Sequence, residues 1–210
     1  MNKDFFILFD KYAPILKGRC ILHFSTGKDA IACLHILTTR CEIKPKLCYW
    51  NLNPFLLEMH RKPLEYFSDK YKTDYVVVPH YDMVADIARK IHKRPPSYKE
   101  WLLKLYYEQG EKPQVFGVKE SDGLIAKMMI NKGARENLHR YYPLAIWKDD
   151  HVFRFLESEG VPIGQSYKNG FRDINEFVDA ESLEYLKENY KQDYDRLISI
   201  EPWRLSLAQE

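Results

Sequence analysis

Residues 25–29, with the sequence STGKD, combine side chains that suit the binding of a polyphosphate. Ser25 and Thr26 carry hydroxyl groups, Gly27 allows the backbone to approach an anion closely, and Lys28 adds a positive charge. An apolar strand-like run precedes these residues and a helix-like run follows them. A loop between a strand and a helix presents backbone N–H groups at the positive end of the helix dipole, so the pattern predicts a phosphate site.

The same loop has other interpretations. Ser25 or Thr26 could cap an ordinary helix, with Asp29 favourably placed in its first turn. A Walker A loop is excluded, because its pattern would require a glycine at Leu22 and a hydroxyl side chain at Asp29. The loop also has too few glycines for a dinucleotide fingerprint.

Strand-like and helix-like runs alternate along the chain after an amphipathic first helix. Predicted strands cover residues 20–24, 45–50, 74–80 and 113–118, and residues 140–147 form either a short strand or an extended segment. Predicted helices cover 29–40, 53–71, 82–92, 148–160 and 179–200, and residues 93–110 begin with a Pro-Pro break and continue as a helix. Pro63 is expected to interrupt or kink the second of these helices, and Asp82 to cap the third. Such alternation implies a parallel sheet covered on both faces.

We therefore predict an α/β fold: a Rossmann-like parallel sheet of five strands with helices on both faces, and a helical C-terminal extension. The nucleotide-binding domain is expected over residues 1–165 and the extension over 166–210. If residues 20–24 form the central strand, the loop that follows lies at the carboxyl ends of the strands, where such sheets bind ligands.

Composition narrows the possible partners. The formal net charge is only +2, so no overall field commits the chain to nucleic acid or membrane. Four cysteines without a C-x-x-C pair argue against a structural zinc site or clustered iron–sulfur ligands: Cys20, Cys33, Cys41 and Cys48. The first twenty residues match neither a signal peptide nor a membrane span. A reduced, cytoplasmic setting is expected.

Three blocks resemble one family. FSTGKDAIACLHIL resembles the pyrophosphate-binding loop, S-G-G-K-D-S with an apolar helix, of the adenine nucleotide α-hydrolase-like (PP-loop) superfamily. Within it, the branch of phosphoadenosine phosphosulfate (PAPS) reductases and related ATP pyrophosphatases is most similar. VFGVKESDGLIAK resembles its G-[IV]-R-x-x-[DE]-S segment, and RYYPLAIWKDDHVFRFLESEGVPI resembles its Y-P-L, W, D-V and G-[IL]-P segment.

The resemblance implies ATP and Mg²⁺ as cofactors, and attack by an acceptor on the α-phosphate with release of pyrophosphate. It implies catalytic roles for Lys28, Asp29 and Lys119. The nucleotide-binding set that it implies is Ser25, Thr26, Gly27, Lys28, Asp29, Ala30, Asn51, Gly117 and Asp122. Asp29 could either orient the loop or approach the metal. No residue is assigned as a metal ligand.

A basic cluster could bind the acceptor. Arg135 and Arg140, with His139 between them, suit an anionic acceptor such as sulfate, phosphate or a nucleic-acid end, although charged runs are usually solvated surface. The acceptor itself is unknown, and a protein partner is left open. Trp147 and Phe153 are expected in the core, and His23 and His35 are expected to pack rather than bind metal.

Departures from the family pattern bear on activity. Thr26 replaces the first glycine of the loop, Ala30 replaces the terminal serine, and Asn51 stands where many relatives have a carboxylate. Lys119 replaces an arginine, which keeps the charge and loses bidentate geometry. No cysteine follows Cys48, so the thiol-dependent PAPS reductase mechanism cannot run within this chain.

Two further functions remain alternatives to an ATP pyrophosphatase. A non-catalytic adenine-nucleotide-binding module or subunit is favoured by Ala30 and Asn51, whereas the retained loop residues Ser25, Gly27, Lys28 and Asp29 favour an enzyme. A nucleic-acid-modifying enzyme is the other, since the superfamily has such members; the nearly balanced charge argues against it.

Overall fold

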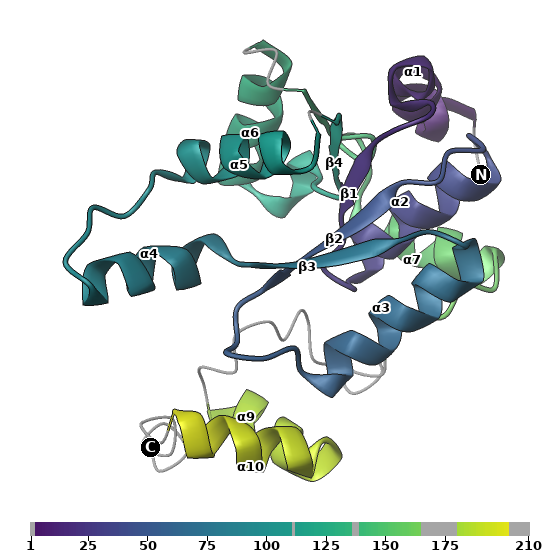
Figure 1. Cartoon of the computed structure of the whole chain (residues 1–210). Helices are drawn as coiled ribbons and strands as arrows, with labels where there is room; N and C mark the ends of the chain where they lie inside the picture. The colour runs from purple at the N-terminus through teal and green to yellow at the C-terminus, as the bar shows by residue number, and fades with distance from the viewer. Residues whose placement is uncertain (1–2, 111, 136–138, 165–179, 202–210) are drawn as a thin grey trace.

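Five parallel strands form the centre of the fold, in the order β3-β2-β1-β4-β5 (Figure 1). The computed structural model describes residues 3–110, 112–135, 139–164 and 180–201. The strands are β1 (Ile21–His23), β2 (Lys46–Asn51), β3 (Tyr75–Pro79), β4 (Gln114–Phe116) and β5 (Arg140–Tyr141). The predicted five-stranded parallel sheet, with residues 20–24 supplying its central strand, is confirmed.

Strand order creates a switch point between β1 and β4. The chain winds from β1 through β2 to β3 on one side, then returns to place β4 and β5 on the other side. In register, His23 lies opposite both Cys48 of β2 and Phe116 of β4. The loops that follow β1 and β4 therefore leave neighbouring strands at the carboxyl edge, where doubly wound sheets bind ligands.

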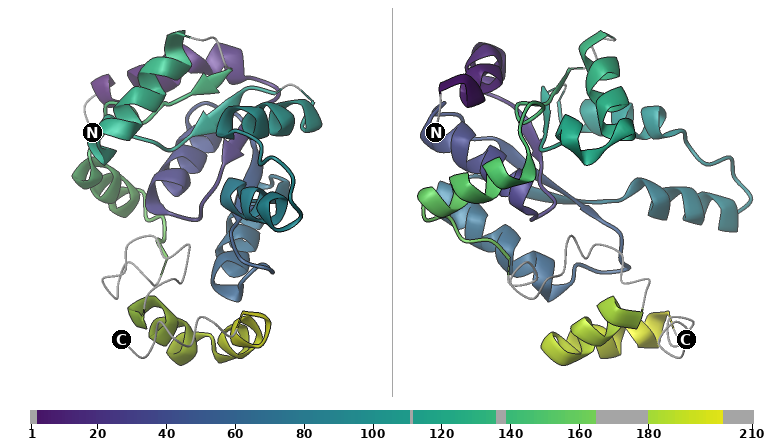
Figure 2. Two further views of the ribbon diagram at one scale, coloured as in Figure 1. Left: turned by 90° about the vertical axis from the view of Figure 1, so that its left-hand side faces the viewer. Right: turned by 180° about the vertical axis from the view of Figure 1, so that it is seen from behind.

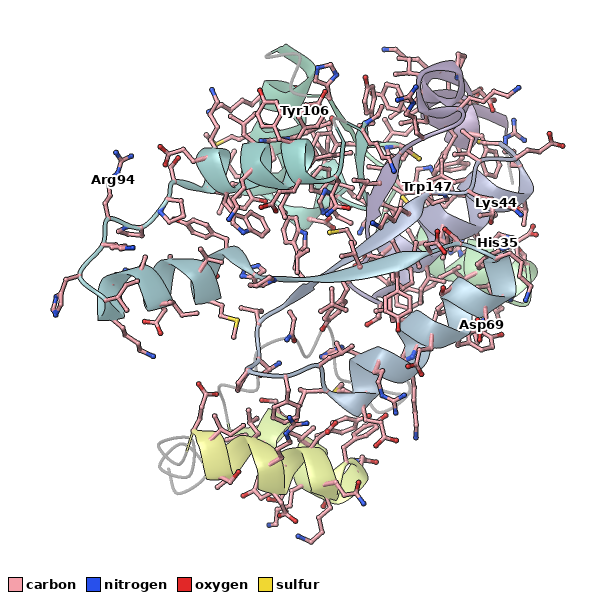
Figure 3. All side chains as sticks on the ribbon, in the orientation of Figure 1. His35, Lys44, Asp69, Arg94, Tyr106 and Trp147 are labelled. Atoms are coloured by element: carbon pink, nitrogen blue, oxygen red, sulfur yellow. The ribbon has the colours of Figure 1, made fainter. Side chains whose placement is uncertain are left out.

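One face of the sheet is covered by α1 (Ile7–Leu16), α2 (Lys28–Thr39), α3 (Glu58–Tyr71) and α7 (Asp149–Ser158) (Figure 1). Leu22 of β1 and Val115 of β4 point into this layer, together with the buried apolar side of α2. Trp147 is fully buried here, as predicted, and its ring N–H donates a 2.7 Å hydrogen bond to the Phe5 carbonyl (Figure 3). Phe5 belongs to the short 3₁₀ helix η1 (Lys3–Phe6).

The opposite face is covered by α5 (Tyr98–Glu108) and α6 (Leu124–Arg135), whereas α4 (Tyr81–Lys90) extends away from the sheet beyond the end of β3 (Figure 2). Ile21 and Phe116 pack against Trp101 and Leu102 of α5. Ile21 and Leu22 enter opposite layers because successive strand side chains alternate between faces. A second 3₁₀ helix, η2 (Glu120–Asp122), follows β4.

The C-terminal part contains two helices where the sequence predicted one over residues 179–200. These are α9 (Ala180–Asn189) and α10 (Lys191–Ile200), below α3 in Figure 1. Tyr190 separates them because its φ of −142° and ψ of 56° are not helical. Leu183, Leu186 and Leu197 form a separate apolar cluster with Leu57, just before α3. The predicted domain boundary at residue 165 lies outside the described residues.

Three local predictions differ from the structure. Helix α3 begins at Glu58 instead of residue 53, and it continues through Pro63 without interruption. Helix α4 is capped by His80, not Asp82: the His80 Nδ1 accepts a 3.2 Å hydrogen bond from the Asp82 backbone N–H. Among the described residues, every helix is too short or too polar to cross a membrane.

Candidate functional site

The loop after β1 leaves the beginning of α2 without a side-chain cap in the described part of the chain. Gly27 is the N-cap residue, so neither Ser25 nor Thr26 occupies the capping position that the alternative interpretation required. The Ser25 hydroxyl instead accepts a long, 3.4 Å hydrogen bond from the Gly27 N–H. The first turn of a helix has N–H groups without intrahelical acceptors, and such a turn favours an anion.

Thr26 has a backbone conformation that favours glycine. Its φ is +63°, in the left-handed region that β-branched residues rarely adopt. This is the position where the resembling family has its first glycine. Holding a threonine in this region costs on the order of 1–2 kcal/mol, and such strain is typical of functional loops.

Gly117 allows the loop after β4 to pack against the beginning of α2. A Cβ atom on Gly117 would lie 3.0 Å from the Ala30 backbone N and 3.0 Å from the Asp29 carbonyl carbon. Any side chain at this position would push the two loops apart. The glycine therefore sets the distance that brings Lys119 to the first loop.

Lys28 and Lys119 share a cluster of three carboxylates. The fully buried Lys119 Nζ lies 2.7 Å from Asp29 Oδ2, 2.9 Å from Asp122 Oδ1 and 3.3 Å from Asp149 Oδ1. The Lys28 Nζ lies 2.9 Å from Asp29 Oδ2 and 3.1 Å from Asp149 Oδ1. Residues from α2, the loop after β4 and α7 therefore meet at one point, which we call the lysine–carboxylate cluster.

Burial and charge set the protonation of the lysine–carboxylate cluster. Burial raises the pKa of Asp29, and Lys119 and Lys28 offset that rise only in part. Burial would lower the pKa of Lys119, but Asp29 and Asp122 outweigh it, so that pKa is raised. Partial burial would raise the pKa of Asp149, but the charges and hydrogen bonds of Lys28 and Lys119 outweigh it, so that pKa is lowered. Both ions of the Lys119–Asp149 pair are therefore stabilised at neutral pH.

A cavity of about 270 Å³ opens beside the loop after β1. Its polar side includes Ser25, Gly27 and Asp29, and its lining also includes aromatic and apolar residues: His23, Phe24, Trp50, Leu52, Phe116 and Val118. A cavity with one polar wall and several aromatic rings suits a nucleotide, whose base is flat and whose phosphates are charged.

His23 is part of this cavity wall and is held rigidly. Its ring stacks on Phe116 at 4.2 Å between centroids, and its Nε2 lies 3.0 Å from Gln114 Oε1. Burial lowers its pKa to about 3, opposed by the Gln114 hydrogen bond and reinforced by the charge of Arg140. His23 is thus a neutral ring that packs in the wall, as predicted.

Asn51 and Arg140, two other predicted site residues, are not among the residues that line the cavity. Asn51 ends β2, between the lining residues Trp50 and Leu52, and its Nδ2 donates a 2.8 Å hydrogen bond to the Asn53 carbonyl. Arg140 begins β5, at the amino edge of the sheet, and is not among the lining residues. Arg135 ends α6, and its side chain is outside the described part of the structure. Neither Asn51 nor Arg140 is therefore part of the cavity lining.

Phe153 is not a core residue, in contrast to the sequence prediction. Its side chain is 37% exposed, and the Lys28 Nζ lies 5.6 Å from its ring centroid. This is within the range of a cation–π contact. Residue 153 lies on the solvent-facing side of α7, and the apolar pattern of the sequence did not indicate this.

Sequence reasoning missed Asp149, Trp50 and His80. The motif block that carries Asp149 was recognised, but nothing in it indicated that this carboxylate would reach both lysines. Trp50 and His80 come from β2 and the residue after β3, and both line the cavity. Their position at the ends of predicted strands was the available signal.

The polar groups present fit a hard cation that also contacts phosphate. Within the described residues, no group of three or more His, Cys, Asp or Glu side chains is placed to hold a metal ion. However, Asp29 lines the cavity, and its Oδ1 is buried without a hydrogen-bond partner. Mg²⁺ is commonly held by one or two carboxylates together with substrate phosphates and water, and Asp29 supplies one carboxylate to the cavity wall.

Comparison with known proteins adds evidence on the fold. No protein-family model and no curated protein sequence matches the chain. The U34-tRNA thiolase NcsA of Methanococcus maripaludis, solved with its [4Fe-4S] cluster, is similar in structure: the TM-score is 0.52 and the identity 14%, over 99% of this chain and 78% of that one.

Two other solved structures are similar. Yeast FAD synthetase in complex with FAD has a TM-score of 0.55 at 14% identity, covering 84% of this chain and 65% of that one. The NH₃-dependent NAD synthetase of Campylobacter jejuni, in complex with nitrate, has a TM-score of 0.55 at 10% identity, covering 100% and 94%. The chain therefore shares the α/β fold of these three proteins. At these identities the likeness establishes the fold and leaves the reaction to the chemistry of the site.

Proposed function

We propose that the chain is an ATP pyrophosphatase similar to the PAPS reductase branch, which binds ATP and Mg²⁺ and transfers adenylate to an acceptor with release of pyrophosphate. The observation that carries this proposal is the lysine–carboxylate cluster at the uncapped N-terminus of α2. Two ammonium groups and a helix N-terminus beside an aromatic-walled cavity match a nucleotide whose phosphates face the loop.

In this proposal the chain's own residues bind and orient the leaving group. Ser25, Gly27 and the N–H groups of the first turn of α2 donate to the pyrophosphate, and Lys28 neutralises its charge. The acceptor attacks the α-phosphorus while the bond from that phosphorus to the bridging oxygen breaks, and pyrophosphate leaves with the electron pair. Charge that develops on the leaving oxygen is stabilised by the preorganised donors.

Lys119 holds the loop after β4 in place and contributes a positive charge to the proposed phosphate site. Because its Nζ contacts Asp29 and Asp122, it couples the loop after β4 to the first turn of α2. Asp29, which lines the cavity, would hold Mg²⁺ through its carboxylate. When bound, Mg²⁺ supplies neutralisation of the polyphosphate charge.

The lysine–carboxylate cluster has more carboxylates than ammonium groups, so the proposal requires Mg²⁺ for ATP to bind. Three carboxylates face two ammonium groups, so the ionised cluster has a net charge of −1. This charge repels a polyphosphate. A divalent cation that contacts Asp29 reverses the sign of the local charge, so the proposal requires ATP affinity to depend strongly on Mg²⁺.

A non-catalytic nucleotide-binding module is the second candidate, and the same cluster favours it. Both lysines are already paired with carboxylates, and Ala30 offers no hydroxyl to the phosphates. Such a module would bind the nucleotide without turnover. In either case this chain supplies no cysteine after Cys48 for a thiol-dependent PAPS reductase reaction.

Product analysis with ATP labelled at the α- or the γ-phosphate tests the proposal. Cleavage at the α-phosphate should give AMP or an adenylated product together with pyrophosphate. Label in ADP and orthophosphate would contradict it, because a site of the Walker type breaks the terminal bond. Tight Mg²⁺-dependent ATP binding with no product from a panel of anionic and nucleophilic acceptors would support the binding module instead.

A further inference from the structure

A second cavity, of about 210 Å³, lies at the amino ends of the strands, opposite the edge that holds the lysine–carboxylate cluster. We call it the basic hollow. It is lined by Gly18, Arg19, Cys20, Lys44, Lys46, Lys72, Thr73, Asp74 and Lys112. Five of these nine residues are cationic and one is acidic, in a chain whose net charge is only +2.

Topology gathers these cations from distant parts of the sequence. Arg19 precedes β1, Lys44 precedes β2, Lys72 precedes β3 and Lys112 precedes β4, while Lys46 is the first residue of β2. These four strands are neighbours in the sheet. Adjacent strands are about 4.8 Å apart, so the cations follow one edge over about 14 Å. Lys44 is labelled in Figure 3 on the side of the sheet away from α4.

The cations of the basic hollow outnumber its one carboxylate, Asp74, and are not paired with it in the described residues. In the described ranges, none of the five cations forms an ion pair with a carboxylate, and Lys46 donates only to the neutral Gln109 Oε1, at 3.1 Å. By contrast, several exposed lysines on the helices are paired, as Lys90 is with Asp86 at 2.7 Å. Gathering like charges is unfavourable unless an anion compensates them.

We propose that the basic hollow binds the phosphodiester backbone of a nucleic acid. A row of about 14 Å is longer than a single phosphate group and matches successive phosphates along a strand. The lining contains no aromatic side chain, so base stacking does not contribute and contacts are made to phosphates, without sequence preference. This site is separate from the proposed ATP site and does not depend on the proposed adenylation.

Three neutral substitutions test the site with little effect on folding. Arg19→Gln, Lys44→Gln and Lys112→Gln remove charge from exposed or half-buried side chains and keep most of each stem. Lys46 is left unchanged because it bonds to Gln109, and Lys72 because its φ is +52°. The full chain is titrated with a fluorescent, mixed-sequence single-stranded RNA or DNA, and binding is followed by anisotropy from 50 to 200 mM salt.

A matched variant controls for the change in net charge. Lys62→Gln, Lys90→Gln and Lys104→Gln also remove three charges, from exposed helix surfaces where each lysine pairs with a carboxylate one turn away. We expect binding by the wild type and the control variant, and an affinity lower by about tenfold or more in the hollow variant. The salt slope should fall in magnitude from about 3.5 to about 1.4, the values for five and for two phosphate contacts.

Several outcomes would overturn the proposal. One is no oligonucleotide binding at 50 mM salt, and another is equal weakening in both triple variants. Displacement of the oligonucleotide by inorganic tripolyphosphate at the same phosphate concentration would assign the hollow to a small polyanion. Equal displacement by phosphatidylserine vesicles would assign it to a membrane surface. Thermal midpoints of all three proteins, measured in parallel, identify any loss that comes from unfolding.

Discussion

Replacing Lys119 by methionine tests the lysine–carboxylate cluster directly. Methionine keeps most of the buried stem and removes the ammonium group, which lies 2.7 Å from Asp29 and 2.9 Å from Asp122. Breaking a buried ion pair by removing one partner costs about 3–5 kcal/mol, because the other charge stays buried. Lys28 remains 2.9 Å from Asp29, so we expect the lower end, about 3 kcal/mol at pH 8.

The loss should depend on pH. Burial already raises the pKa of Asp29 in the presence of Lys119, and removal of the ammonium group raises it further. A carboxyl group whose pKa is raised by folding favours the folded state at low pH, and this stability is lost as the pH rises through the folded pKa. The variant should therefore lose less stability at pH 5 than at pH 8.

Urea unfolding of the ligand-free protein, followed by tryptophan fluorescence, measures both effects. If the midpoint urea concentration falls while the dependence of the unfolding free energy on urea is unchanged, the variant has lost stability. The double variant Lys119→Met with Asp29→Asn should recover about 1 kcal/mol or more at pH 8, because it removes the uncompensated carboxylate. Equal stability of Lys119→Met and wild type at pH 8, or an equal loss at both pH values, would refute the reasoning.

Three further predictions concern the two loops. Lys28→Met should weaken Mg²⁺-dependent ATP binding by about 1.5–3 kcal/mol in calorimetric titration, the range for a charge-assisted hydrogen bond; unchanged affinity would remove Lys28 from the phosphate site. Gly117→Ala should lower the free energy of unfolding by about 1–3 kcal/mol, because its Cβ would lie 3.0 Å from Ala30 N and the loops must separate; a neutral result in urea unfolding would contradict that close approach. Thr26→Gly should raise the thermal midpoint, since relief of about 1–2 kcal/mol of left-handed strain exceeds the greater chain entropy of glycine; a lower midpoint would show that the threonine is not strained.

The sequence was most informative where a feature is local. Residues 25–29 carry their own hydroxyl, glycine and lysine groups in one short loop, so the phosphate-site hypothesis needed no tertiary information. Alternating strand-like and helix-like runs predicted the parallel sheet, because periodicity reports which faces are buried. Two errors came from single residues whose backbone conformation the pattern does not report. Tyr190 interrupts a helix whose sequence pattern is continuous, and Pro63 lies within α3 without ending it.

The sequence by itself determined the class of fold and the loop that can bind phosphate, because residue types and short-range periods decide strands, helices and turns. Only the tertiary structure decided which carboxylates neutralise the lysines. Asp149 reaches Lys28 because α7 packs against α2, and Lys119 reaches Asp29 because β4 pairs with β1 and Gly117 admits close contact. Four separate pre-strand segments likewise form the basic hollow only in the order β3-β2-β1-β4. Such convergence depends on pairing between segments about a hundred residues apart, which no local pattern specifies.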